Sequence, residues 1–407
     1  MPAFAGMTRM RESRTMTTDP IVILSYARTP MGGFLGELSP LTATQLGAVA
    51  VKGAVERSGL KPDQIERCYM GCVLPAGLGQ APARQAAIYG GLPNTVEATT
   101  INKMCGSAMQ AAIMASDAIA AGSADIIVAG GLESMSNAPY LNLKHRTGAR
   151  IGHDRLYDHM YFDGLEDVYE QGKLMGNFAE DVAREYQFTR EKQDEFAIAS
   201  LTRTQTHAKE LANEIVPVTV KTRKGEVVID TDEQPRNANI DKIPTLKPAF
   251  AKDGTITAAN ASSISDGAAA LVITKASVAE KLGVKPIARI VSHAAHAHAP
   301  NYFTTAPVGA AKKALEKAGW TIGDVDLFEV NEAFATVAMI AMHDLGVPHD
   351  VLNIHGGACA LGHPVGASGA RIIGALINGL QVNGQKRGLA SICLGGGEAT
   401  AMAVELM

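Results

Sequence analysis

A pattern that occurs twice, about 260 residues apart, constrains the fold of this chain most. Residues 54–59 read AVERSG and residues 314–319 read ALEKAG, an offset of 260. Further along, VAGGLE at 128–133 parallels CLGGGE at 393–398, an offset of 265. Two ordered matches at nearly one offset favour two similar halves with one insertion over a chance likeness of Ala- and Gly-rich segments. Such halves would bury their facing helices in common and leave a cleft where they meet.

Short apolar runs alternate with helical patterns in the first half. The expected strands are 21–26, 63–73, 98–102 and 125–129, and the expected helices are 41–58 and 107–121. Apolar runs bounded by turn residues predict the strands, and apolar residues at helical spacing before a glycine predict the helices. Alternation at this spacing is typical of βαβ units and predicts an α/β fold with a mostly parallel sheet.

The local composition changes in the middle of the chain, where charged residues, His and Tyr are more frequent. Within this region, residues 191–211 have the pattern of one amphipathic helix. We expect four parts. These are a disordered extension at 1–20, an N-terminal half at 21–134 with 265–286, an inserted loop domain at 135–264, and a C-terminal half at 287–407. The extension contains Arg, Met and Thr but lacks the apolar segment of a secretory signal.

Composition excludes several classes of protein. Lys and Arg number 37 against 41 Asp and Glu, a formal net charge of −4, whereas a large nucleic-acid footprint brings a strongly basic balance. No apolar run reaches the roughly 18–20 residues of a membrane span. The five cysteines are odd in number and sparse, which is typical of a reducing cytoplasm. We therefore expect a cytoplasmic protein with no nucleic-acid or membrane partner.

Two segments contain the residues of a nucleophilic site. Cys105 stands where a helix follows a strand, and the free N–H groups of a helix N-terminus favour thiolate over thiol. His363 lies between Gly362 and Pro364 in a glycine-rich loop, where a restrained imidazole can activate a thiol. The alternatives are a buried structural cysteine and a loop histidine with satisfied nitrogens.

Two further segments lie at the ends of expected strands. Asn331 stands where a helix begins, so it is either an N-cap or the holder of a water or an oxyanion. Cys393 precedes residues 395–397, three glycines whose backbone N–H groups form an anion nest. A cysteine at such a turn can act as acid or base if its pKa is tuned. Together these residues suit carbon–carbon bond formation through an acyl-cysteine.

In these segments the chain resembles the thiolase family, from about residue 21 to its C-terminus. The segments are NKMCGSAM (102–109), AGGLESMSNAPY (129–140), NEAFA (331–335), GGACALGHPVGASGAR (356–371) and CLGGGEATAM (393–402). The resemblance implies a thiolase-like fold of two βαβαβαββ halves in five α-β-α-β-α layers, with an inserted loop domain. It also implies a homodimer or homotetramer, in which residues 134–140 belong to the loop that pairs dimers.

The resemblance further implies an acyltransferase of fatty acid metabolism that reversibly condenses two acetyl-CoA to acetoacetyl-CoA and CoA, without a metal or redox cofactor. Cys105 would become acetylated while His363 takes its proton, and Cys393 would remove the α-proton of the second acetyl-CoA. His363 and a water held by Asn331 would form one oxyanion hole. The backbone N–H groups of Cys105 and Gly395 would form the other.

The same resemblance implies contacts with coenzyme A and the acyl group. The residues are Ser262, Ala259, Arg236, Met175, Leu174, Phe303 and Phe334. Leu174 replaces a His that is common in short-chain members, and Phe303 stands where bacterial biosynthetic members often carry Met. Leu201 replaces a Tyr of potassium-activated members. The alternative activity is therefore a 3-ketoacyl-CoA thiolase of β-oxidation with a preference for medium chains.

Three other readings fit these residues less well. A ketoacyl synthase would place histidines where Asn331 and Cys393 stand. A non-catalytic acyl-binding member of the superfamily would lack Cys105, His363 or Cys393, and this chain has all three. A metal protein would use the histidines of the segment HAAHAH (293–298), which also suit a surface or cleft without a metal.

Overall fold

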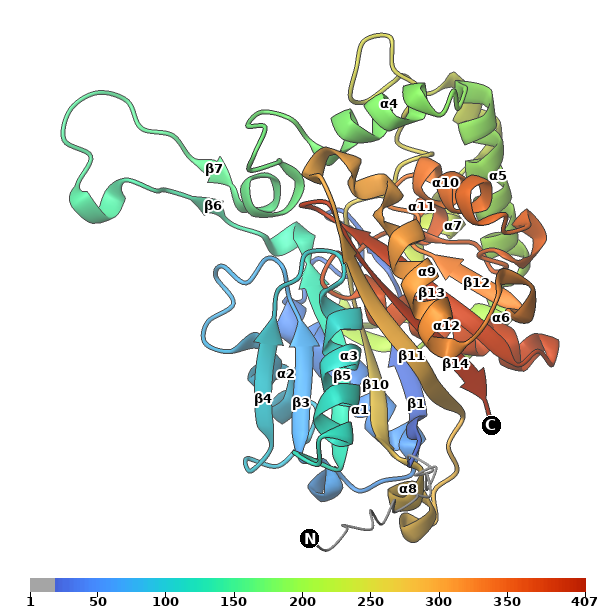
Figure 1. Cartoon of the computed structure of the whole chain (residues 1–407). Helices are drawn as coiled ribbons and strands as arrows, with labels where there is room; N and C mark the ends of the chain where they lie inside the picture. Colours follow the sequence, from blue (N-terminus) through green and yellow to red (C-terminus); the bar gives the residue numbers. More distant parts are fainter. Residues whose placement is uncertain (1–18) are drawn as a thin grey trace, which may run out of the picture.

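The computed structural model describes residues 19–407, so most of the predicted extension, residues 1–18, lies outside the described part. Figure 1 shows one large twisted sheet with helices on its faces. Within residues 19–407, ten strands form this sheet in the order β12-β13-β14-β11-β1-β10-β5-β3-β4, and β2 pairs with β10. The family-like α/β architecture expected from the sequence is therefore present.

The N-terminal half supplies six of these strands. They are β1 (Ile21–Arg28), β2 (Gly32–Gly33), β3 (Arg67–Gly71), β4 (Glu97–Ile101), β5 (Ile126–Ser134) and β10 (Ser265–Lys275). Its helices are α1 (Ala43–Ser58), α2 (Pro82–Tyr89), α3 (Ser107–Ala120) and α8 (Ala276–Leu282). The strands and helices predicted before residue 134 are all confirmed, with shifted ends.

The C-terminal half supplies the other four strands. They are β11 (Ala288–Ala297), β12 (Leu327–Val330), β13 (Arg387–Leu394) and β14 (Glu398–Leu406). Its helices are α9 (Ala306–Ala318), α10 (Ala335–Leu345), α11 (Ala358–Leu361) and α12 (Ser368–Asn383). The two halves join where β1 and β11 pair over only two positions, Val22 with Arg289 and Ile23 with Ala288.

The duplication is visible in the order of the strands and in local detail. The order β3-β5-β10-β1 in the N-terminal half corresponds to β12-β13-β14-β11 in the C-terminal half. In place of a counterpart of β4, the C-terminal half has a single bridge between Phe328 and Leu352. Both first strands carry a bulge, which re-aims the side chain that follows it. The hydroxyls of Ser25 and Ser292 then donate to helix carbonyls in α1 and α9, both at 2.6 Å.

The sheet is mixed, so the expectation of a mostly parallel sheet is wrong. Only the pairs β3–β4, β3–β5 and β12–β13 are parallel. The last two strands of each half run antiparallel. In the N-terminal half β10 pairs with β5 after the long insertion, and in the C-terminal half a tight turn joins β13 to β14. A tight turn of this kind can join only antiparallel neighbours. The alternation of strand and helix patterns in the sequence predicts the parallel strands of each half but not the last strands, β10 and β14, which run antiparallel to their neighbours.

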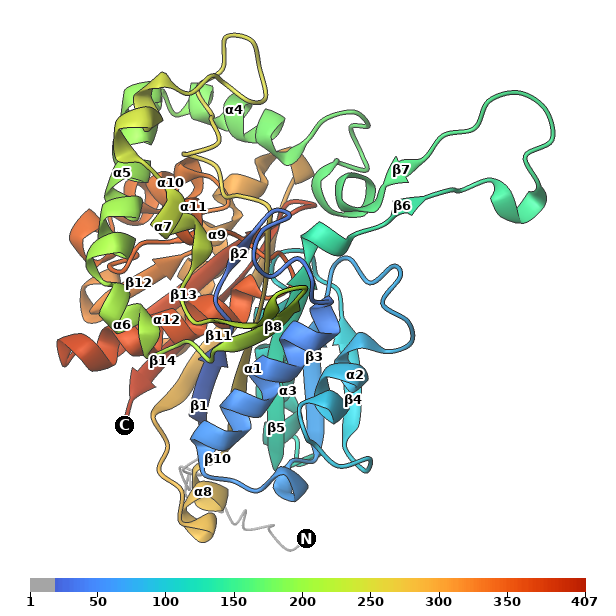
Figure 2. The same cartoon turned by 180° about the vertical axis from the view of Figure 1, so that it is seen from behind.

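Five layers follow from the positions of the helices. The helices α1 and α2 cover the outer face of the N-terminal strands, and α9 covers that of the C-terminal strands, as Figures 1 and 2 show from opposite sides. Between the two sets of strands lie α3 and α12, which contact each other. Their buried residues Met109 and Ile372 share one apolar cluster with Ile127 and Ile392. The five-layered arrangement is confirmed.

The segment between β5 and β10 forms a cap beside this body and a long arm. Its helices are α4 (Met175–Glu185), α5 (Arg190–Thr206), α6 (Ala208–Ala212) and α7 (Glu233–Asn237), and its strands are β6 (Tyr140–Leu141), β7 (Tyr157–Asp158), β8 (Val218–Thr222) and β9 (Gly225–Ile229). The arm, at β6 and β7, projects away from the body (Figure 1). The predicted helix over 191–211 is two helices, because the ring of His207 bonds the Arg203 carbonyl at 2.8 Å and the backbone leaves helical geometry there. The four-part division of the chain stays a prediction.

Candidate active site

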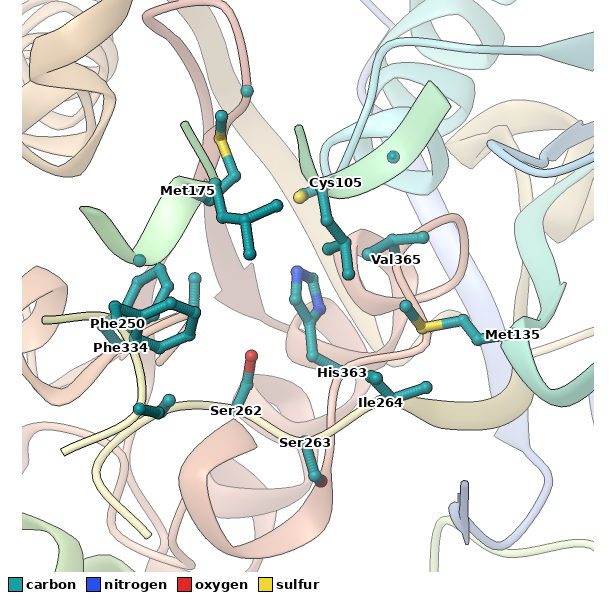
Figure 3. A pocket seen from close by; sticks show the side chains of 18 of the residues that line it. Cys105, Met135, Met175, Phe250, Ser262, Ser263, Ile264, Phe334, His363 and Val365 are labelled. Atoms are coloured by element: carbon teal, nitrogen blue, oxygen red, sulfur yellow. The ribbon is translucent and has the colours of Figure 1, made fainter. Parts of the chain in front are cut away.

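A mostly apolar cavity of about 330 Å³ lies between the two halves and the cap. Its walls include eight residues predicted for the site. They are Cys105, Leu174, Met175, Ser262, Phe303, Phe334, His363 and Gly395. Figure 3 shows the side chains of Cys105 and His363 pointing into the same space, with Met175 on one side and Val365 on the other. Residues far apart in the sequence therefore share one small pocket.

Cys105 stands on a tight turn at the start of α3. The residue before it, Met104, has φ +45°, in the left-handed region that non-glycine residues rarely adopt. Two side chains hold the turn: Asn102 accepts from the N–H of Met104 at 3.0 Å, and Ser107 donates to its carbonyl at 2.6 Å. A larger residue at Gly106 would require Leu394 to move, because a Cβ there would lie 2.4 Å from a methyl carbon of that side chain.

The Cys105 side chain is held as a neutral thiol. Burial raises its pKa to about 11, although the backbone N–H groups of Gly395 and of Cys105 itself act in the opposite direction. The N–H groups at the start of the helix therefore favour the thiolate as expected, but desolvation outweighs them. The same two N–H groups are those predicted for an oxyanion hole, and both face the sulfur.

His363 is held as a neutral base with one nitrogen free. Its Nδ1 lies 2.6 Å from the hydroxyl of Ser368, which itself donates to the Pro364 carbonyl at 3.0 Å. The hydroxyl therefore accepts from Nδ1–H, and Nε2 carries the lone pair. Nε2 is buried and has no hydrogen-bond partner within residues 19–407. Burial, followed by the charge of Arg371, lowers the pKa of His363 to about 3.

The loop of His363 is tied to the other half of the molecule by Glu133, which sequence reasoning did not single out. Its buried carboxylate accepts from the backbone N–H groups of Val73, Leu74 and Gly366 at 2.9, 3.2 and 2.9 Å. Burial raises the pKa of Glu133 to about 7. Its place in the segment AGGLESMSNAPY was the available signal, since a Glu within an apolar strand requires partners.

Cys393 and Asn331 lie behind the wall of the cavity. Burial, and then the interaction with Cys105, raise the pKa of Cys393 well above its usual value. The backbone N–H of Asn331 donates to Ser391 at 3.0 Å, which places it on the neighbouring strand end. Asn331 is not an N-cap, because α10 begins at Ala335 and Phe334 occupies the cap position.

Two residues predicted for coenzyme A lie elsewhere. Ala259 is outside the wall of the cavity and packs near Leu201 and Ile243. Arg236 pairs with Glu37 at 2.7 Å, so its guanidinium already has a carboxylate partner. Their contacts with coenzyme A stay predictions. Ser262, in contrast, lines the cavity on a segment that bonds the Ala333 carbonyl at 2.9 Å.

Comparison with known proteins decides which family this geometry belongs to. The family model for the N-terminal domain of thiolase matches residues 21–277, and that for the C-terminal domain matches residues 284–406. The chain belongs to the thiolase family. The thiolase match spans both halves and so includes every residue of the site described above.

Proteins of similar sequence and structure match this thiolase over nearly its whole length. An acetyl-CoA acetyltransferase of Cupriavidus necator is 49% identical over 95% of this chain and 99% of its own length. A cytosolic acetyl-CoA acetyltransferase of Gibberella zeae is 45% identical over 95% of this chain and 98% of its own length. The crystal structure of the Bacillus anthracis acetyl-CoA acetyltransferase superposes with a TM-score of 0.93 and 37% identity. The match covers 96% of this chain and 99% of that chain.

Other features of this thiolase bear on the alternatives. Among residues 19–407 no group of three or more His, Cys, Asp or Glu side chains is placed to hold a metal ion. In the segment HAAHAH, His293 instead faces Asp117 at 3.2 Å, and His298 lies 2.8 Å from the Tyr302 carbonyl. No helix in that described range has the length and apolar character needed to cross a bilayer.

Proposed function

We propose that this thiolase catalyses the reversible condensation of two acetyl-CoA to acetoacetyl-CoA and CoA, through an acetyl group on Cys105. The observation that carries the proposal is that Cys105 and the free Nε2 of His363 open into one small apolar cavity. Relatives 45–49% identical over nearly the whole chain are named acetyl-CoA acetyltransferases, which supports the same activity here.

In the first half-reaction the Cys105 sulfur attacks the carbonyl carbon of acetyl-CoA while its proton passes to Nε2 of His363. The C–S bond to coenzyme A breaks, and the proton on His363 is given to the departing thiolate. Because the Cys105 thiol is neutral, proton transfer must accompany attack. The N–H groups of Cys105 and Gly395 stabilise the oxyanion of the tetrahedral intermediate.

In the second half-reaction the Cys393 thiol first gives its proton to Nε2 of His363, and its thiolate then removes a proton from the methyl carbon of another acetyl-CoA. The carbanion attacks the acetyl group on Cys105, a carbon–carbon bond forms, and the bond to the Cys105 sulfur breaks. The protonated His363 then gives its proton to that sulfur while Cys393 keeps the α-proton, so acetoacetyl-CoA leaves a site with both cysteines protonated and His363 neutral. His363 and a water held by Asn331 stabilise the thioester enolate. Coenzyme A enters and leaves as part of the substrates, and no other cofactor takes part.

The size of the cavity favours short acyl groups. About 330 Å³ is near the lower end for small-molecule sites, and Leu174, Met175 and Phe334 add apolar surface to it. We propose that acetoacetyl-CoA is a good substrate and that five- or six-carbon substrates are accepted, whereas eight carbons are not. A medium-chain thiolase of β-oxidation is the alternative that the same measurement tests.

Assembly and location are part of the proposal. The arm between β6 and β7 exposes Tyr140, Leu143, Ile151 and Leu156, and exposed apolar residues in one projecting segment suit contact with a second copy. A homodimer or a homotetramer is therefore expected. The five cysteines, all within the described residues, are free, which suits the reducing cytoplasm.

The experiment combines a substrate series with a variant that separates the two half-reactions. We expect kcat/KM for thiolysis of 3-ketoacyl-CoA to fall between six and eight carbons, and Cys393→Ser to acetylate Cys105 in a burst without turning over. Mass spectrometry of the quenched enzyme measures the burst. A maximum at eight carbons would establish the β-oxidation alternative, and loss of the burst with turnover would refute the assigned division between the cysteines.

A further inference from the structure

Arg371, on the central helix α12, is buried in a way that stability alone does not explain. It is 1% exposed, and the only hydrogen bond of its side chain within residues 19–407 runs from Nη2 to Oδ1 of Asn331 at 3.3 Å. Its Nε and Nη1 have no partner in that range. Arg28, equally buried, bonds the carboxylates of Glu214 and Asp232. A buried cation with unpaired donors is costly to keep.

The charge of Arg371 reaches both a buried carboxyl and the catalytic base. Burial raises the pKa of Glu329 to about 8, and Arg371 is the largest influence in the opposite direction. The same guanidinium contributes to the lowered pKa of His363. Arg371 therefore lies close enough to the site for its field to act on a developing negative charge there.

The contact with Arg371 also decides how the Asn331 carboxamide is turned. A guanidinium has only donors, so only Oδ1 can face it, and a flipped amide would set N–H against N–H. The amide nitrogen must then point to the other side. Nδ2 is buried and lacks a partner anywhere in the described chain, so its two N–H donors are available to a water.

We infer that Arg371 is a positioning residue of the reaction, which holds Oδ1 of Asn331 so that Nδ2 donates to the water of the enolate oxyanion hole. This inference rests on the proposed function, which assigns that water to Asn331. Without Arg371 the Asn331 carboxamide is no longer held in one orientation, and part of the stabilisation of the enolate is lost. Acetylation of Cys105 uses the other oxyanion hole and is left intact.

The test is a double-mutant cycle with Arg371→Met, Asn331→Ala and the pair. We expect Asn331→Ala to lower kcat for condensation about 10²–10³-fold, as for the loss of one oxyanion-hole donor. Arg371→Met should lower it about 10–100-fold with KM for acetyl-CoA within about threefold, by analogy with second-sphere residues. In the Asn331→Ala background, Arg371→Met should add less than about threefold. The burst of Cys105 acetylation should survive in all three variants.

Arg371→Lys keeps the charge and is the variant that decides the matter if Arg371→Met does not fold. It should lower kcat for condensation less than Asn331→Ala does, and it should add less than about threefold in the Asn331→Ala background. Arg28→Lys is the matched control, a buried arginine away from the cavity, and it should lower the unfolding temperature without changing kcat. Equal losses from Arg371→Met with and without Asn331 would overturn the inference, as would unchanged turnover in Asn331→Ala. A wild-type enzyme without thiolysis activity would overturn the proposed function as well.

Discussion

At the scale of single residues, burial decides the chemistry of the site more than local sequence does. Cys105 stands at a helix N-terminus, yet desolvation raises its pKa to about 11. His363 is driven the opposite way, to a pKa of about 3, and so remains an unprotonated base. Both groups are neutral at neutral pH. The site therefore holds its reacting pair uncharged until a substrate arrives, and proton transfer is part of the attack.

This state predicts how the free enzyme reacts with iodoacetamide. Only the thiolate reacts, so the labelling rate of Cys105 should rise about tenfold for each pH unit from 7 to 10 without a plateau. Cys105 should be labelled before the more deeply buried Cys68 and Cys393, and acetyl-CoA should protect it. Peptide mass spectrometry at each pH measures the rates. A plateau below pH 8 would mean a thiolate stabilised by the helix end, contrary to the raised pKa.

At the scale of elements, the site depends on ties between loops that follow different strands. Glu133, at the end of β5, binds the backbone of Val73 and Leu74 after β3 and that of Gly366 in the loop of His363. Gly131 allows this loop to approach, because a Cβ there would lie 1.9 Å from the Gly366 carbonyl oxygen. One carboxylate thus fixes the distance between the catalytic histidine and the N-terminal half.

Glu133→Gln tests that tie. The amide keeps one acceptor but turns an N–H₂ group toward backbone N–H donors, so at least one buried hydrogen bond is lost. We expect a loss of about 1–3 kcal/mol in the free energy of unfolding and a fall in kcat of at least about tenfold. Urea unfolding and steady-state thiolysis measure the two. Glu97→Gln, at an exposed ion pair on β4, is the control and should change neither.

At the scale of the whole molecule, the duplicated halves bring separate residues to one cavity. Cys105 comes from the N-terminal half, His363 and Gly395 from the C-terminal half, and Ser262 from the segment between β5 and β10. Both helices of the central layer have their N-terminal ends near this cavity, since α3 begins after Cys105 and α12 begins after His363. The arm at β6 and β7 projects away from the body (Figure 2), while its residues Leu143 and Tyr157 line a neighbouring cavity together with Met175 and Gly395.

Shortening the arm tests its role in assembly. In the homotetramer that is one of the two proposed assemblies, replacing residues 142–156 with a two-residue turn should leave dimers, because the exposed apolar residues Leu143, Ile151 and Leu156 are removed. Light scattering after gel filtration gives the mass of each form. Thiolysis by the shortened enzyme serves as the control for folding. An unchanged mass would place the contact between dimers elsewhere.

The sequence by itself predicted most of the elements, the duplication and the candidate site residues, because local patterns and motif spacing carry those signals. The strand 125–129, the helix 107–121 and the order of Cys105, Asn331, His363 and Cys393 were all readable from residues near each other in the chain. Only the tertiary structure decided the antiparallel return of β10 and β14, the tie made by Glu133, and the orientation of Asn331 by Arg371. Each of these depends on contacts between segments far apart in the sequence, and on burial, which shifts pKa values by amounts that no local pattern encodes.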